Sequence, residues 1–118
     1  MTVLTVYRVH HRTNELDGPF TSRLAPSWST PVSDDYPDIE QDCGGELPCD
    51  FVCGTRDMRN LRHWLQSDVW IHELHCAGFM VSVYSVPEHA IMEGKSGKQC
   101  AFRLTDSVKM SEMELFWV

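Results

Sequence analysis

The stretch from Leu24 to Thr55 limits the fold of this chain more than any other part of the sequence. It contains four of the six prolines and a glycine pair, namely Pro26, Pro31, Pro37, Pro48 and Gly44-Gly45. Proline and glycine favour turns over helices and sheet interiors, so this composition predicts a loop with at most short extended pieces. Large apolar residues recur within it, at Trp28, Tyr36, Ile39 and Phe51. We therefore expect an ordered loop that packs on the body of the protein.

The same stretch, called the acidic segment below, carries the whole net charge of the chain. It has no Lys or Arg and seven acidic residues: Asp34, Asp35, Asp38, Glu40, Asp42, Glu46 and Asp50. The other ten acidic residues balance the ten Lys and Arg, so the formal charge of −7 belongs to this segment. A patch of one sign attracts cations and basic protein surfaces and repels bare nucleic acid. Two interpretations stay open: a surface that binds a basic partner, or a solvated loop that aids solubility.

Length and composition predict one folded domain over residues 1–118. Four Trp, five Phe and three Tyr in 118 residues can form one hydrophobic core. The longest apolar runs are too short to cross a membrane, so no membrane association is expected. The first residues lack the three regions of a signal peptide, which predicts a cytoplasmic protein with reduced cysteines. The odd number of cysteines, five, also argues against a disulfide framework.

Three segments have the composition of β-strands. They are Thr2–His10, Phe79–Val86 and Gln99–Leu104, rich in β-branched and aromatic residues. Both faces of the first are mostly apolar, which predicts a central strand. A short strand at His89–Met92 fits the pattern too, while the last residues, 106–118, fit a helix or a final strand equally well.

The region between Arg56 and Ala77 is predicted to be helical. Apolar residues at helical spacing, Met58, Leu61, Trp64 and Leu65, follow a predicted cap at Thr55. A second, shorter helix is predicted from Val69 to Ala77, with Ser67 as its cap and Gly78 as its end. The expected fold class is α+β: a small, mostly antiparallel sheet packed by one or two helices, with the long acidic loop across one side.

Metal ligation and nucleophilic catalysis find only weak support. The thiols of Cys43, Cys49 and Cys53 are the candidate zinc ligands, but their spacing lacks the repeated close pairs of zinc sites. A second group, His72-Glu73-Leu74-His75-Cys76, lacks the spacing of a metalloprotease helix. We therefore expect packed thiols and no metal cofactor. The glycine-rich stretch from Gly94 to Lys98 lacks the phosphate-loop spacing and precedes a predicted strand, which predicts a hairpin turn.

Arg8 lies in the middle of an apolar strand and needs a specific partner. A buried guanidinium is stable only beside groups that accept its hydrogen bonds, such as a carboxylate or a phosphate. Arg8 can therefore hold a ligand, pair with an acid of this chain, or point outward from an edge strand.

Several short motifs together resemble small uncharacterised accessory proteins of bacteriophages and prophages. The motifs are Val6-Tyr7-Arg8-Val9-His10-His11, Gly18-Pro19-Phe20-Thr21-Ser22, Gly78-Phe79, Gly94-Lys95 and Gln99-Cys100-Ala101-Phe102. They cover both ends of the chain and leave the acidic segment unmatched. This resemblance implies a protein that acts in the cytoplasm of a host cell.

The strand motifs are also faintly similar to compact ADP-ribosyltransferase-like domains. That resemblance implies that Arg8 holds a dinucleotide, that Ser82 or Ser85 supports it, and that Gln99 orients the acceptor, with NAD as the cofactor. Gln99 is not followed by the glutamate usual in that family, so catalysis does not follow from the motif alone.

Two functions from different classes result. The first is a phage accessory protein that binds and inhibits a host or anti-phage defence complex, as anti-CRISPR proteins do. In it, the acids from Asp34 to Asp50 imitate phosphates toward a basic, nucleic-acid-binding partner, with Trp28, Tyr36 and Phe51 as anchors and no direct contact with nucleic acid. The alternative is an NAD-binding or ADP-ribosyltransferase-like enzyme that uses Arg8, Ser82 and Gln99.

Overall fold

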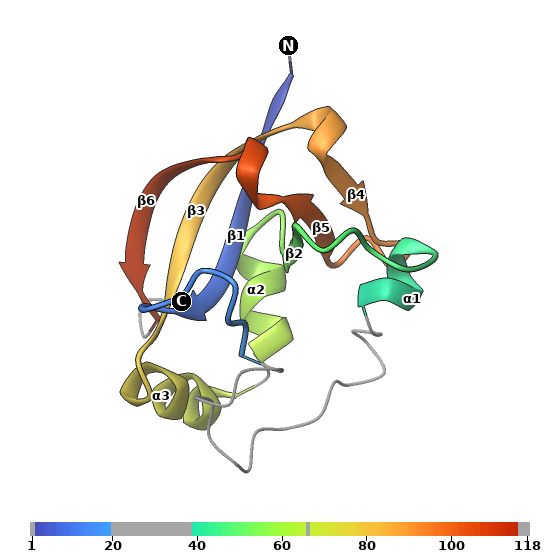
Figure 1. The fold of residues 1–118 in the computed structure, drawn as a ribbon. Helices are drawn as coiled ribbons and strands as arrows, with labels where there is room; N and C mark the ends of the chain where they lie inside the picture. The colour runs from blue at the N-terminus through green and yellow to red at the C-terminus, as the bar shows by residue number, and fades with distance from the viewer. Residues whose placement is uncertain (1, 20–38, 66, 116–118) are drawn as a thin grey trace.

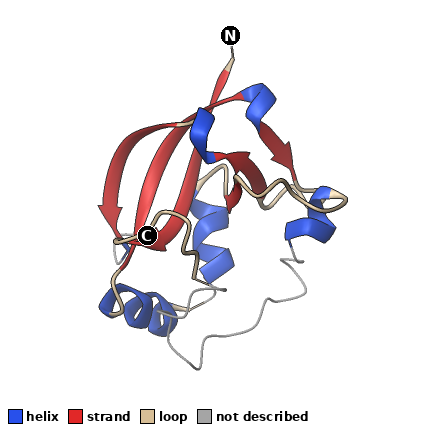
Figure 2. Ribbon diagram, viewed as in Figure 1, coloured by secondary structure: helices blue, strands red, loops and turns tan. Residues whose placement is uncertain are grey.

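The computed structural model describes residues 2–19, 39–65 and 67–115, and its fold is α+β, as predicted. Within these residues it has two three-stranded antiparallel sheets and three α-helices (Figures 1 and 2). No helix among the residues described is both long enough and apolar enough to cross a membrane.

The first sheet contains the two ends of the described chain. It has the order β1-β3-β6, with β1 at Val3–His11, β3 at Phe79–Pro87 and β6 at Val108–Glu114. Of the two alternatives for residues 106–118, the strand is therefore found over Val108–Glu114, while residues 116–118 lie outside the described residues. β3 is the central strand and β1 an edge, so the prediction of a central first strand was wrong. Both faces of β1 are nevertheless covered along its second half, which explains its apolar composition.

The second sheet was not predicted. It has the order β2-β5-β4, with β2 at Phe51–Gly54, β5 at Cys100–Arg103 and β4 at Ile91–Glu93. The strand expected at Gln99–Leu104 therefore exists as β5, but it is the centre of this second sheet. A single bridge between Tyr7 and Thr55 links the two sheets. Strand β2 lies in the acidic segment, where a loop with at most short extended pieces was expected.

Helices α2 (Met58–Leu65) and α3 (Asp68–Cys76) confirm the predicted helical region. Ser67 caps α3 as predicted, because its side chain accepts a hydrogen bond from the Trp70 amide. The cap of α2 is Asp57 and not Thr55: Asp57 Oδ1 accepts from the Asn60 amide at 2.7 Å. Gly78 follows α3 with a φ of 97°, a conformation that favours glycine over residues with a side chain.

Three short helices complete the fold. Helix α1 (Ile39–Cys43) lies in the acidic segment, where no helix was expected. Part of the strand predicted at His89–Met92 is a 3₁₀ helix, η1 (Glu88–Ala90), because Pro87 ends β3 and the chain turns before β4. A second 3₁₀ helix, η2 (Leu104–Asp106), leads from β5 to β6.

The two faces of the first sheet pack on different elements. On one face, Val9 and Val81 pack with α2, α3 and the buried Trp70. On the other face, Val6 and Tyr84 pack with the second sheet around Phe102. Alternate residues of β1 therefore belong to different cores, because successive side chains of a strand point to opposite faces. Arg8 shares the face of Val6 and lies beside the second core.

Candidate functional site

The acids of the acidic segment differ in their surroundings. Glu40 and Glu46 are exposed. Asp50 is half-buried and its Oδ2 lies 3.0 Å from Arg103 Nε. The predicted binding residues Asp34, Asp35, Asp38, Trp28 and Tyr36 lie outside the described residues.

Asp42 is buried and organises a turn of the second sheet. Its carboxylate accepts hydrogen bonds from the Ser96 amide at 2.8 Å, from the Ser96 hydroxyl at 2.7 Å and from Gln99 Nε2 at 3.2 Å. The Asp42 carbonyl also accepts from the Lys95 amide. This carboxylate, only 4% exposed, is therefore not part of an outward-facing acidic surface, unlike the prediction for Asp42.

The electrostatics of Asp42 match this structural role. Burial alone would raise the pKa of its carboxyl, but the hydrogen bonds from Ser96 and Gln99 outweigh it and hold the pKa below the usual value. Gly94 is required by close approach, since a Cβ there would lie 2.2 Å from Asp42 Oδ2. The turn joins β4 to β5 as an antiparallel pair, which confirms the hairpin predicted at Gly94–Lys98.

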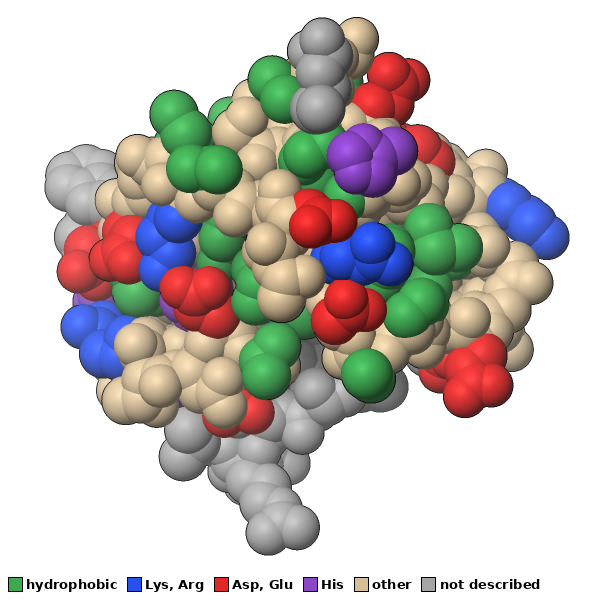
Figure 3. All heavy atoms as spheres, turned by 45° about the horizontal axis from the view of Figure 1, so that its top comes forward, with side chains coloured by type: hydrophobic (Ala, Val, Ile, Leu, Met, Phe, Trp, Pro, Cys, Tyr) green, Lys and Arg blue, Asp and Glu red, His purple; other side chains and the backbone are tan. Residues whose placement is uncertain are grey.

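Acidic and basic side chains are interspersed on the face of the molecule seen in Figure 3, where no single continuous acidic patch appears. Several charged side chains of the described residues form ion pairs. Arg56 pairs with Glu93, and Arg62 with Asp68. In these two pairs, Arg56 and Arg62 thus contact acids that lie outside the acidic segment.

Arg8 is 3% exposed, and within the part of the chain that the structure describes its guanidinium donates to backbone carbonyls and to no carboxylate. Its Nη1 donates to the Cys53 carbonyl at 2.8 Å, and its Nε donates to the Glu15 carbonyl at 3.0 Å. Gly18 lies against the guanidinium, with room for a Cβ at 3.6 Å from Nη2. Arg8 therefore ties β2 and the turn after β1 to the first sheet.

His10 and Ser82 form a second buried contact on the same face. His10 Nε2 lies 2.6 Å from Ser82 Oγ, and His10 Nδ1 lies 2.8 Å from the His11 carbonyl. A carbonyl only accepts, so Nδ1 carries the proton and Nε2 accepts from the Ser82 hydroxyl. Burial, aided by the positive charge of Arg8, lowers the pKa of His10 and keeps the ring neutral near pH 7.

Glu15, Tyr84 and Lys109 extend this contact toward the surface. Tyr84 donates its hydroxyl proton to Glu15 Oε2 at 3.2 Å, and Lys109 Nζ pairs with Glu15 Oε1. The hydrogen bond from Lys109 holds the pKa of Glu15 below its usual value, and the same contact raises the pKa of Lys109. We refer to Arg8, His10, Glu15, Ser82, Tyr84 and Lys109 as the buried polar network, of which Glu15 and Lys109 are the partly exposed outer members.

A serine that donates to a histidine has the arrangement of a nucleophile and its base. Ser82 is 0% and His10 1% exposed, so a substrate has no access to either in this conformation. Sequence reasoning missed His10 and Glu15. The signal for His10 was available, because it lies two residues after Arg8 in one strand and must share its face.

The structure brings together two of the three residues suggested for an enzyme. Arg8 and Ser82 are opposite one another in the register of β1 and β3. Gln99 is 4% exposed and donates to Asp42 in the turn of the second sheet.

The predicted zinc candidates do not form a ligand set. Over residues 2–19, 39–65 and 67–115, no three His, Cys, Asp or Glu side chains come together as metal ligands. Cys43, Cys49 and Cys53 are free thiols, and Cys43 Sγ donates to the Met92 carbonyl at 3.5 Å. Burial raises the pKa of the Cys43 thiol, which opposes thiolate formation.

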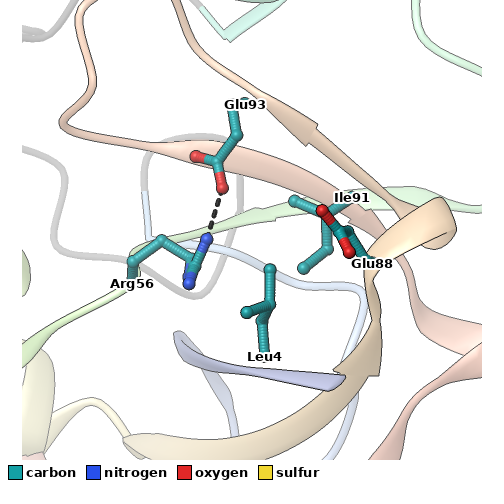
Figure 4. A pocket seen from close by; sticks show the side chains of 5 residues that line it. All are labelled: Leu4, Arg56, Glu88, Ile91 and Glu93. Atoms are coloured by element: carbon teal, nitrogen blue, oxygen red, sulfur yellow. Dashed lines mark hydrogen bonds and ion pairs between the residues drawn. The ribbon is translucent and has the colours of Figure 1, made fainter. Parts of the chain in front are cut away.

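A groove of about 450 Å³ opens between β1 and β4. Leu4 and Ile91 point into it, with the carboxylates of Glu88 and Glu93 and the guanidinium of Arg56 around them (Figure 4). Arg56 Nη1 lies 2.5 Å from Glu93 Oε1. Sequence reasoning did not find this groove, since its residues come from three separate parts of the chain.

Comparison with known proteins gives one match. A family model described as "Bacteriophage T4 Y00F protein" matches residues 1–116, which is nearly the whole chain. No curated protein and no solved structure matches. The comparisons thus support the resemblance to small phage proteins and lend no support to the one with ADP-ribosyltransferases.

Proposed function

This chain belongs to the bacteriophage T4 Y00F protein family, and from that premise we propose that it is a phage accessory protein that acts by binding a basic partner. The partner we propose is a host or anti-phage defence complex in the host cytoplasm, inhibited when its nucleic-acid-binding surface is occupied. The observation that carries the proposal is the charge of the acidic segment, seven acids without one Lys or Arg.

The surroundings of the described acids narrow the set that we propose for binding. Asp42 is buried and committed to the turn with Ser96, so we leave it out. Asp50 is already paired with Arg103, so its contribution is small. The proposed binding residues are therefore Asp34, Asp35, Asp38, Glu40 and Glu46, with Trp28 and Tyr36 as apolar anchors.

Burial favours a binding function over the enzymatic alternative. An enzyme residue has to touch its substrate, whereas Arg8, Ser82 and Gln99 are all less than 5% exposed and bonded within the chain. The alternative is tested by the melting temperature in the presence of NAD, because a ligand that binds the folded state raises it. A clear rise at millimolar NAD, lost on Ser82→Ala, would favour the enzyme.

A capture experiment from a lysate of the bacterial host tests the binding function. The immobilised protein is compared with the triple variant Asp34→Asn, Asp35→Asn, Asp38→Asn. The control variant loses three charges elsewhere, through Asp68→Asn, Asp106→Asn and Glu112→Gln. We expect the wild type and the control to retain the same basic proteins and the segment variant to lose most of them.

Salt dependence gives a second readout for the same captured proteins. Binding between opposite charges at a surface weakens as salt screens them, over a Debye length of about 8 Å at physiological ionic strength. We expect release between low and moderate salt. Identical capture by the segment variant, together with retention at high salt, contradicts the proposed function.

A further inference from the structure

The groove between β1 and β4 is a second place suited to another molecule, outside the acidic segment. Its apolar walls, Leu4 and Ile91, come from β1 and β4 and lie at the outer end of the core around Val6 and Phe102. The volume of about 450 Å³ is enough for one long side chain. The groove is open to solvent, and Figure 4 shows both aliphatic side chains pointing into it.

The charges around the groove leave one carboxylate unpaired. Arg56 and Glu93 pair with each other and so neutralise each other. Glu88 is exposed, and among the described residues no side chain or backbone group binds its carboxylate. A cation is thus the group that completes this site, and an anion would meet the unpaired charge of Glu88.

Two unpaired strand edges flank the groove. Strands β1 and β4 are edges of their sheets, and in the described part of the chain Val3–Thr5 pair only with β3 and Ile91–Glu93 only with β5. Such edges offer backbone donors and acceptors to an added strand. The other edge of the first sheet, β6, carries a bulge opposite Val83 and Tyr84, a feature that discourages edge pairing.

From these observations we propose that the groove binds an extended segment of a basic partner through one lysine or arginine side chain. The aliphatic stem of that side chain lies on Leu4 and Ile91, and its cationic head binds Glu88. The backbone of the segment pairs with the edge of β4. This inference rests on the proposed function for the charge of the partner, and it adds where and in which conformation one segment is held.

An NMR titration with synthetic peptides tests the groove directly. The probe is an acetylated, amidated hexapeptide of alternating valine and lysine, and the control peptide has glutamate in place of lysine. We expect the lysine peptide to shift the backbone amide signals of Val3–Thr5 and Ile91–Glu93, and the glutamate peptide to leave them unchanged. Shifts elsewhere but not at these residues overturn the proposal, as does an equal response to both peptides.

Charge variants measure how much Glu88 contributes. Glu88→Gln is expected to lower the affinity for the lysine peptide roughly fivefold, which is the upper end of the range for one exposed ion pair. Glu88→Lys should abolish its binding. Glu73→Lys on α3, far from the groove in Figure 1, makes the same change of net charge and should alter the affinity by less than about twofold. An equal loss in Glu73→Lys overturns the proposal, because it indicates an effect of net charge alone.

The two proposals fail in different ways. If the Asp34, Asp35 and Asp38 variant loses its captured proteins while Glu88→Lys binds the lysine peptide like the wild type, the groove assignment is wrong and the proposed function stands. If the Asp34, Asp35 and Asp38 variant captures the same proteins as the wild type while Glu88→Lys abolishes peptide binding, the groove assignment is supported and the proposed function of the acidic segment is wrong.

Discussion

The buried polar network and the acidic segment hold their charges in opposite ways. In the network, Arg8 donates to two carbonyls, and Glu15 binds both Tyr84 and Lys109. In the segment, Glu40 and Glu46 stand exposed with no basic residue near them in the sequence. A charge removed from water must find partners within the protein, whereas an exposed charge stays free for another molecule. The network therefore stabilises the fold, whereas the exposed acids of the segment are the ones that we propose for binding.

Asp42 shows that this difference follows burial and not position in the sequence. It belongs to the acidic segment, yet its carboxylate is buried and accepts three hydrogen bonds. Glu40, two residues before it, is exposed, and its Oε2 accepts a hydrogen bond from the Leu47 amide at 3.1 Å. The following predictions test the comparison, beginning with the largest effect.

Removal of the Arg8 guanidinium should have the largest effect on stability. Arg8→Ala leaves the Cys53 and Glu15 carbonyls without their donor in the interior, so we expect a loss of about 3 kcal/mol in the free energy of unfolding. Urea unfolding measures it. The matched control, Arg59→Ala on the exposed side of α2, should change stability by less than about 0.5 kcal/mol. Equal losses in both variants would show that Arg8 is not a structural tie.

The turn around Asp42 should respond next. Gly94→Ala forces a Cβ to within 2.2 Å of Asp42 Oδ2, and we expect a loss of about 2 kcal/mol in the free energy of unfolding. Glu46→Ala, in the exposed part of the same segment, is the control and should be nearly neutral. Stability unchanged by Gly94→Ala would mean that the turn does not need this close contact.

The stabilising effect of the Asp42 carboxylate should disappear in acid. Its pKa in the folded state lies below the unfolded value of about 3.9, so the folded state favours the charged form. That stability is present above pH 4 and is lost as the pH falls through the folded pKa. Asp42→Asn should be destabilised at pH 7 by about 1 kcal/mol, with a smaller difference at pH 3. An equal difference in free energy of unfolding between the wild type and Asp42→Asn at both pH values would contradict a stabilising role for the charged carboxylate.

His10 should give a smaller pH dependence in a different window. Its pKa is lowered in the folded state, so below about pH 6.5 the unfolded chain gains a proton that the folded chain does not. The free energy of unfolding therefore decreases as the pH is lowered from about 6.5 to the folded pKa of His10, by at most about 1.4 kcal/mol per pH unit. His10→Gln should remove this slope between pH 7 and pH 5, as measured by urea unfolding. The exposed His89 is the control, and His89→Gln should keep the slope.

The smallest effect on stability is expected from the acids that we propose for binding. The triple change of Asp34, Asp35 and Asp38 to Asn should alter the free energy of unfolding by less than about 0.5 kcal/mol, since the proposed function requires these charges to face a partner, and exposed charges contribute little to stability. Its effect should be on binding alone. Thermal unfolding of the variant and the wild type at low and high salt measures the change in stability. A loss of several kcal/mol would indicate that these acids have structural partners.

Local patterns predicted most of the elements. β-branched runs at Val3–His11 and Phe79–Pro87 and the apolar spacing of Met58–Leu65 correspond to β1, β3 and α2. Ser67 was recognisable as a cap because capping depends on a few adjacent residues. The errors concern pairing. β5 lies in a second sheet with β2, a four-residue strand whose proline-rich surroundings gave no strand signal.

The sites were less predictable than the elements, since each depends on residues far apart in the chain. Arg8 was recognised as needing partners, but those partners are backbone carbonyls, which no side-chain pattern reveals. Gln99 suggested a catalytic residue, whereas its amide donates to Asp42. The groove of Leu4, Arg56 and Glu88 has no sequence signal of any kind, because two sheet edges have to meet before it exists.

The sequence by itself determined the amount and sign of charge in the acidic segment, the positions of the main strands and helices, and membership of a phage protein family. These are properties of composition and of neighbouring residues. Only the tertiary structure decided which charges face water and which are bound inside. Asp42 and Glu40 are two residues apart, but one closes a turn through Ser96 and the other remains at the surface. Burial is set by contacts between distant segments, and burial determines whether a charge stabilises the fold or is left to bind a partner.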